Sequence, residues 1–190
     1  MIGAAVAQSL SVLSYFPLSP ADIAAGCVKP DFCLDAIKYP HNKEKSFGYV
    51  MQLMEGLSAV GVPRTARESR DYSSALGVTL HFIADYFCLA HNNKQLNPLM
   101  AHVAYEFALH HESCRTDLVG KALMSAAAAR THPRTSVAML KEYIEAMHAE
   151  YLITFPSMAN DIHYAITMST MVAHTIVNMT LALGQNRTAA

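Results

Sequence analysis

Apolar positions recur every three or four residues along most of the chain, which is the spacing of an amphipathic α-helix rather than of a half-buried strand. The clearest case runs from Tyr49 to Leu57, and Gly61-Val62-Pro63 follows it closely. Glycine and proline at that distance stop a helix. This stretch therefore predicts a helix from about residue 43 to residue 60.

The same spacing predicts further helices, and Pro and Asn residues mark the breaks between them. The segment from Lys29 to His41 is predicted as a loop because it contains Pro30 and Pro40. No strand pattern, internal repeat or low-complexity run interrupts this picture. The chain is therefore predicted to be an all-α, single-domain helical bundle over residues 1–190. The remaining predicted helices cover residues 67–90, 97 to beyond 110, 118–129, 134–154 and 157–183.

The last of these helices raises the question of a membrane span. The stretch from Ile162 to Asn186 carries no Asp, Glu, Lys or Arg and is long enough to cross a bilayer. It nevertheless contains His163, His174 and many Ser and Thr residues, and it does not stand out from an apolar chain. We expect a buried terminal helix and no transmembrane span.

Composition and charge exclude several classes of protein. Of the 190 residues, 52% are hydrophobic and 15% are charged, which is enough apolar material for a core and excludes a disordered chain. Fourteen basic and fifteen acidic residues leave a formal charge of −1. Arg64, Arg67 and Arg70 form only a small basic cluster, so no nucleic-acid partner is expected.

Cysteine use and the first residues bear on the compartment. Cys27, Cys33, Cys88 and Cys114 form no CxxC pair and are too sparse for a disulfide scaffold, so we expect buried thiols. Residues 1–7 lack the basic region that opens a signal peptide. The chain as written is expected to be cytoplasmic, and a secreted protein is the alternative if further residues precede it.

The ten histidines are the most informative feature of the composition. His81 and Asp85 lie four residues apart on a predicted helix and so share one face, about 6 Å apart along the axis. His102 and Glu106 repeat this arrangement, and His91 lies between the two pairs. Imidazole and carboxylate groups at this spacing can bind a metal ion, and a carboxylate can bridge two. Spacing alone leaves open a multinuclear metal site and a set of hydrogen-bonded core histidines.

Other catalytic motifs fit less well. Glu145-Ala-Met-His148 is a single Glu-x-x-His motif, whereas a di-iron bundle needs two. His111-Glu112 lacks the second His of a zincin helix. The chain has no His-Asp dipeptide, which argues against an HD-type phosphohydrolase. A glycine-rich phosphate loop and a nucleophile elbow are also missing from the sequence.

The order of the candidate ligands resembles that of the bacterial zinc-dependent phospholipase C family, which is related to the S1/P1 nucleases. The matching pattern is Pro30-Asp31, Pro40-His41, His81-x3-Asp85-x5-His91 and His102-x3-Glu106. The segment 76–92 is similar to short clostridial-type members, and the similarity covers about residues 26–111. The resemblance implies a helical fold of the phospholipase C / P1 nuclease type.

The resemblance also implies a set of zinc ligands. One zinc ion would be held by Asp31, His41, His81 and Asp85. A second would be held by His91, His102 and Glu106. In the family a third zinc is bound by the N-terminal residue, a nearby histidine and the carboxylate that Asp85 matches. This chain has Met1 where the family has a mature tryptophan, and no His precedes His41, so the resemblance supports Zn²⁺ at two sites and leaves the third incomplete.

The function implied by the resemblance is hydrolysis of a phospholipid phosphodiester bond by metal-activated water, with transient contact to a membrane surface. Asp85 would bridge two ions and Asp31 would orient or deprotonate the water, which makes these two the catalytic candidates. Phe32 and Tyr39 are expected in the core, with the headgroup pocket as the alternative. Two other functions stay open: an S1/P1-like nuclease or phosphatase, and a catalytically impaired, zinc-stabilised helical module.

Overall fold

The computed structural model of the protein describes residues 1–11, 16–32, 39–96 and 98–188, and these ranges are helical with no strand among them. The predicted all-α fold is confirmed. In chain order the helices are α1 (Ile2–Leu10), α2 (Pro20–Gly26), α3 (Lys29–Phe32), α5 (Lys43–Ala59), α6 (Ala66–Tyr86), α7 (Leu89–Asn92), the 3-10 helix η1 (Lys94–Leu96), α8 (Leu99–Cys114), α9 (Leu118–Thr131), α10 (Val137–Ile153) and α11 (Met158–Thr188).

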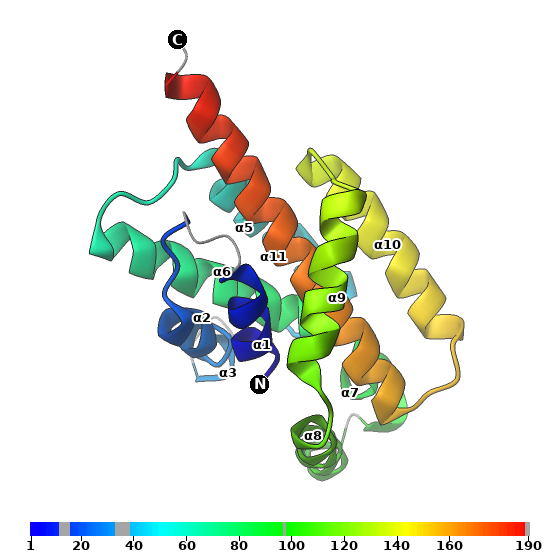
Figure 1. The fold of residues 1–190 in the computed structure, drawn as a ribbon. Coiled ribbons are helices and arrows are strands. Elements are labelled where there is room, and N and C mark those ends of the chain that lie inside the picture. Colours follow the sequence, from blue (N-terminus) through cyan, green and yellow to red (C-terminus); the bar gives the residue numbers. More distant parts are fainter. Residues whose placement is uncertain (12–15, 33–38, 97, 189–190) are drawn as a thin grey trace.

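The longest helix, α11, runs through the middle of the bundle (Figure 1). It packs against α1, α5, α6, α8, α9 and α10. Its side chains between Ile162 and Val177 form a large part of the shared hydrophobic core. The stretch Met158–Gln185 is long and apolar enough to cross a membrane, but 67% of its most apolar window is buried in the fold. This is the position predicted for a buried terminal helix.

Side-chain caps fix where the helices that carry the candidate ligands begin. Thr65 accepts a hydrogen bond from the backbone N–H of Glu68, and the Glu68 carboxylate accepts one from the N–H of Thr65, so a capping box starts α6. Asn42 caps α5 by accepting a hydrogen bond from the N–H of Lys45. Because Asn42 directly follows His41, the turn that starts α5 also holds His41 in place.

Helices α2 and α6 approach each other closely through two glycines. A Cβ atom on Gly77 would lie only 2.8 Å from the Cα atom of Gly26, so neither position has room for a side chain. This contact lays the end of α2 across α6. The backbone carbonyl of Cys27 thereby comes within 2.8 Å of Nδ1 of His81.

The helix predicted over residues 67–90 is wrong at its end, because α6 stops at Tyr86 and His91 lies on the separate helix α7. One local and one long-range side chain stabilise this break. The side-chain amide of Asn92 donates a hydrogen bond to the carbonyl of Tyr86 (3.0 Å). The carboxylate of Asp161 accepts one from the first backbone N–H of α7 (2.9 Å). Residue periodicity carries no information on either partner.

The predicted loop from 29 to 41 begins with a helical turn, α3, because proline suits the first turn of a helix. Residues 33–38 lie outside the described part. The prediction that Phe32 packs in the core is wrong, since its side chain is 84% exposed at the end of this four-residue helix. Tyr39 packs against the core as expected, with its ring stacked on Tyr49 at 3.8 Å between centroids.

The prediction of buried thiols holds only in part. Cys88 is buried and Cys27 is half-buried, and burial raises the pKa of the Cys27 thiol to about 12. Cys114 is exposed, contrary to the prediction, and it is the last residue of α8. Cys33 lies outside the described residues.

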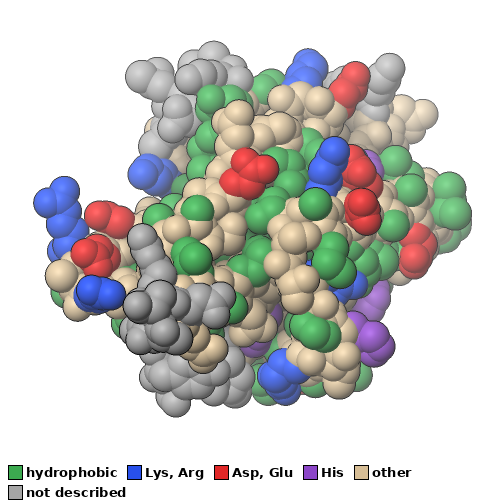
Figure 2. Space-filling model, turned by 90° about the horizontal axis from the view of Figure 1, so that it is seen from above, with side chains coloured by type: hydrophobic (Ala, Val, Ile, Leu, Met, Phe, Trp, Pro, Cys, Tyr) green, Lys and Arg blue, Asp and Glu red, His purple; other side chains and the backbone are tan. Residues whose placement is uncertain are grey.

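Side chains of like charge do not form clusters on the face of the molecule that Figure 2 shows. Acidic and basic side chains alternate there over a surface that is largely apolar or neutral. Within the small basic cluster at the start of α6, Arg67 forms an ion pair with Asp71 (3.7 Å).

Candidate metal centre

All seven predicted ligands converge at one end of the bundle, although they come from separate segments of the chain. The ends of α3 and α6 supply three of them, the turn before α5 one, and α7 and α8 the rest. Their ligand atoms form overlapping groups in which all atoms lie within 4.8 Å of one another. These groups are Asp31, His41 and His81; His41, Asp85 and His91; and His91, His102 and Glu106.

The first cluster has the dimensions of a four-coordinate zinc site. Oδ2 of Asp85 lies 3.1 Å from Nε2 of His81 and 3.2 Å from Nδ1 of His41. The two imidazole nitrogens are 3.4 Å apart. Oδ1 of Asp31 lies 3.6 Å from His81 and 3.7 Å from His41. Tetrahedral ligands about 2.0–2.1 Å from a zinc ion are separated by about 3.3 Å, so these four atoms can surround one ion.

The second cluster adjoins the first through Asp85. Nε2 of His91 lies 3.3 Å from Oε1 of Glu106, and Nε2 of His102 lies 3.2 Å from the same oxygen. The Oδ1 atom of Asp85 lies 3.5 Å from Nε2 of His91. Asp85 therefore turns one carboxylate oxygen toward each cluster, which is the arrangement of a bridging ligand.

Two buried atoms of the first cluster test whether a cation fits. Oδ2 of Asp85 and Nε2 of His41 are buried, and neither has a hydrogen-bond partner of good geometry among the described residues. Buried polar atoms in native proteins are nearly always paired. A cation among the four ligand atoms would compensate the Asp85 oxygen directly. The donor set of imidazoles and carboxylates is one that Zn²⁺ accepts.

Electrostatics keep Asp85 ionised. Burial alone would raise its pKa, but the neighbouring His81 and His91 outweigh burial and hold the pKa of Asp85 well below its usual range. Burial lowers the pKa of His81, but Asp85 outweighs it and raises the pKa to about 9. In the absence of a cation, His81 therefore holds a proton near neutral pH. A metal ion that binds here must displace that proton.

Comparison with known families identifies the chain. The family model described as zinc dependent phospholipase C matches residues 1–157. The chain belongs to the zinc-dependent phospholipase C family. No curated protein and no solved structure matches it significantly. The resemblance inferred from the order of the ligands is thus confirmed, and the family supports zinc as the metal and hydrolysis as the chemistry. The individual ligands and the number of ions stay predictions.

A backbone contact orients His81 in this phospholipase C domain. The carbonyl of Cys27 lies 2.8 Å from Nδ1 of His81, so it fixes the tautomer in which Nδ1 carries the proton. Nε2 is then free to bind a cation. The close packing of α2 on α6 therefore determines how His81 faces the centre.

Asp161 is a positioning residue that the sequence analysis missed. It is 1% exposed, and its carboxylate accepts hydrogen bonds from Tyr105 (2.8 Å), Tyr151 (2.7 Å) and the backbone N–H of Leu89 (2.9 Å). These partners belong to α8, α10 and α7. Asp161 thus ties the two helices that carry His91 and Glu106 to α11. No local motif marks this role, because the partners lie 10 to 72 residues away along the chain.

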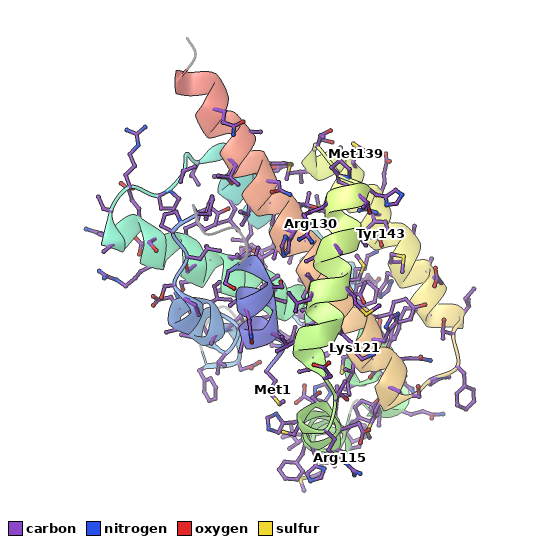
Figure 3. The ribbon with its side chains drawn as sticks, in the orientation of Figure 1. Met1, Arg115, Lys121, Arg130, Met139 and Tyr143 are labelled. Carbon is purple, nitrogen blue, oxygen red and sulfur yellow. The ribbon has the colours of Figure 1, made fainter. Side chains whose placement is uncertain are left out.

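A cavity of about 320 Å³ adjoins both clusters. Asp31, Asp85, His91 and Glu106 line one side of it, and apolar residues of α6, α8 and α11 line the other. Met1 also lines it and points from α1 toward α8 (Figure 3). Phe32 and Tyr39, the alternatives for a headgroup pocket, do not line this cavity.

Proposed function

We propose that the protein hydrolyses the phosphodiester bond on the glycerol side of phospholipids, with zinc ions held by the seven clustered side chains. The observation that carries the proposal is the position of Asp85 between the two clusters, with one oxygen toward each. The first ion would be held by Asp31, His41, His81 and Asp85. The second would be held by His91, His102 and Glu106 together with the other oxygen of Asp85.

Zinc bound in these clusters would supply hydroxide near neutral pH and positive charge for the phosphodiester, because it lowers the pKa of bound water to about 7. Asp31 is the group best placed to take the proton of the attacking water. Its side chain is 47% exposed on the open side of the first cluster, and burial raises its pKa above the ordinary value. Asp85 would hold the two ions at a fixed separation.

The size of the cavity supports a substrate whose bulk stays outside. About 320 Å³ is at the small end of ligand pockets, enough for a phosphate group and a compact headgroup. Two long acyl chains would not fit in that volume. A phospholipid would therefore enter by its headgroup, with its chains beyond the rim.

The distribution of basic and aromatic residues favours this substrate over a nucleic acid. The chain has no Trp, and Arg67 and Arg70 lie at the opposite end of α6 from Asp85. Fifteen residues of helix separate Arg70 from Asp85, which is about 22 Å. A single-stranded nucleic acid at the centre would thus lack the basic groove and stacking platforms such substrates need.

The proposal is tested by following release of diacylglycerol and phosphocholine from phosphatidylcholine after zinc loading. Asp85→Asn is expected to lower kcat/KM roughly a hundredfold or more, because it removes the bridging charge. Asp71→Asn is the matched control, since that exposed carboxylate pairs with Arg67 on the same helix. Equal rates for the wild type and Asp85→Asn would contradict the proposal, and turnover of single-stranded DNA but not of lipid would reassign the activity.

A further inference from the structure

We propose that the outward face of α8, next to the metal centre, docks the protein onto a phospholipid bilayer, a proposal that rests on the proposed function. Four large apolar side chains on this helix are more than half exposed: Leu99 (74%), Met100 (81%), Val103 (51%) and Phe107 (73%). We call them the α8 stripe. Clustered apolar side chains exposed in this way mark interaction sites.

The α8 stripe lies directly beside the ligands. Leu99, Val103 and Phe107 are spaced by four residues and so form one row along the helix. His102 and Glu106 each follow a member of this row by three residues, which places them along one edge of it. The same helix therefore contributes two candidate zinc ligands to the second cluster and apolar side chains to the solvent-exposed surface.

Exposed apolar side chains also occur on the other elements around the cavity. Phe32, 84% exposed, directly follows Asp31 on α3. Met1, 51% exposed, lines the cavity, and its Sδ atom lies 3.4 Å from Sγ of Cys114 at the end of α8. Exposed apolar side chains thus occur at the start of α1 and on α3 as well as on α8.

Charge and geometry point to a bilayer as the occupant. Between Leu99 and Cys114 the helix has no Lys or Arg, and its acidic residues are Glu106 and Glu112. Binding through this face would therefore depend on insertion of apolar side chains rather than on attraction to anionic lipids. A protein partner on the rim would obstruct the cavity. A bilayer on the rim presents headgroups to the cavity while the acyl chains stay in the lipid.

Flotation of the zinc-loaded protein with vesicles of a non-hydrolysable phosphonate analogue of phosphatidylcholine tests docking without turnover. The double variant Leu99→Ser/Phe107→Ser is expected to bind these vesicles at least tenfold more weakly, which is about 1.4 kcal/mol. The matched control is Val60→Ser/Met139→Ser, two side chains 48% and 45% exposed, with Met139 at the far end of the molecule from α8 (Figure 3). Equal binding by the wild type and the α8 variant would overturn the proposal. Binding that is lost at about 1 M salt would also overturn it, since only charge attraction is screened.

A tryptophan reporter gives a second readout that does not depend on tolerance of serine. The chain contains no Trp, so Phe107→Trp introduces a single indole whose emission can be followed. Its emission is expected to shift to shorter wavelength when phosphatidylcholine vesicles are added, because the indole moves from water into the bilayer. The emission of Met139→Trp is expected to stay constant. No shift for Phe107→Trp, or equal shifts for both, would contradict docking through α8.

Rate measurements on two substrates distinguish an error in the docking proposal from an error in the proposed function. The rate on long-chain vesicles divided by the rate on monomeric short-chain phosphatidylcholine is expected to fall at least tenfold in Leu99→Ser/Phe107→Ser. An unchanged ratio would overturn docking and leave the proposed function standing. If the wild type hydrolyses neither substrate, the proposed function is wrong. Vesicle flotation and tryptophan emission still test whether the α8 stripe docks onto a bilayer. A stable dimer that the double variant dissociates would assign the α8 stripe to self-association instead.

Discussion

Asp85 and His91 face each other across the break between α6 and α7, with 3.5 Å between Oδ1 and Nε2. On an unbroken helix, residues six apart point about 120° away from each other. Because α6 ends at Tyr86 and a new helix begins at Leu89, His91 turns back toward a carboxylate that α6 already presents to His81. The break in the helix is therefore what allows Asp85 to serve two clusters.

Zinc is expected to stabilise the fold as well as to support turnover. A ligand that binds only the native state at a hundred times its Kd adds about 2.7 kcal/mol to the free energy of unfolding for each site. Treatment with EDTA should therefore lower the Tm, and added zinc should restore it. Elemental analysis of the reloaded protein is expected to give two ions per chain. A Tm that does not respond to EDTA would contradict a zinc centre in these clusters.

Asp161→Asn is expected to weaken the second cluster selectively. The substitution removes the charge that holds the Tyr105 and Tyr151 hydroxyls and the N–H of Leu89, at a cost of about 1.5–3 kcal/mol in stability. Loss of such a supporting partner lowers metal affinity roughly 10–100-fold. Calorimetric titration with zinc should show weakening of one binding step and not of the other.

The control for Asp161→Asn is the same exchange at the exposed Asp71, which should change neither step. Equal weakening of both steps by Asp161→Asn would show a general loss of stability. That result would remove Asp161 from the set of positioning residues.

Gly77→Ala is expected to displace α2 from α6. The added Cβ would meet the Cα of Gly26 at 2.8 Å, and overpacking of this kind costs about 1–3 kcal/mol. The shift would also pull the carbonyl of Cys27 from His81, so zinc affinity should fall with the Tm. Gly56→Ala in α5 is the control, because no atom lies within 4 Å of its added Cβ and alanine favours a helix by about 1 kcal/mol. A Gly77→Ala variant with full zinc affinity would show that His81 is oriented by other contacts.

His174 is expected to make the fold sensitive to acid. It is fully buried, Nε2 lies 3.1 Å from Oγ of Ser9, and burial, with a smaller effect from Arg130, lowers its pKa to about 4. The unfolded chain holds the proton below about pH 6.5, so stability from neutral His174 is present above that pH and is lost as the pH falls toward 4. The loss approaches about 3 kcal/mol.

The test compares the zinc-free wild type with His174→Gln by denaturant unfolding between pH 7 and pH 4. The difference in free energy of unfolding should move in favour of the variant as the pH falls. His132→Gln, at an exposed position, should follow the wild type. A difference that is independent of pH would exclude His174 as the titrating group.

Periodicity predicted the long helices well, since α5, α9, α10 and most of α11 fall within a few residues of their predicted ranges. These helices carry repeated apolar positions with capping or stop residues at their ends, so nearby residues determine where each helix begins and ends. The short helices α1, α2 and α3 were not predicted, because a few residues give too little pattern to distinguish a helix from a loop.

The seven ligands could be predicted because their order along the chain matches that of a known family. The contacts that support them could not be predicted. The carbonyl of Cys27 contacts His81 across 54 residues of chain, and Asp161 contacts Tyr105 and Leu89 across 56 and 72 residues. Nothing near either residue in the sequence marks such a contact. The exposure of Phe32 was missed for the same reason, since the packing around α3 is a property of the assembled bundle.

The location of Asp161 on the final helix has a consequence for how the protein matures. All seven ligand residues are synthesised before residue 161, yet the hydrogen bonds that tie α7 and α8 to Asp161 form only when α11 docks. A nascent chain therefore exposes these imidazoles and carboxylates before the hydrogen bonds of Asp161 can hold α7 and α8 in place. Ions at the second cluster are therefore expected to bind tightly only once α11 has been synthesised and has docked.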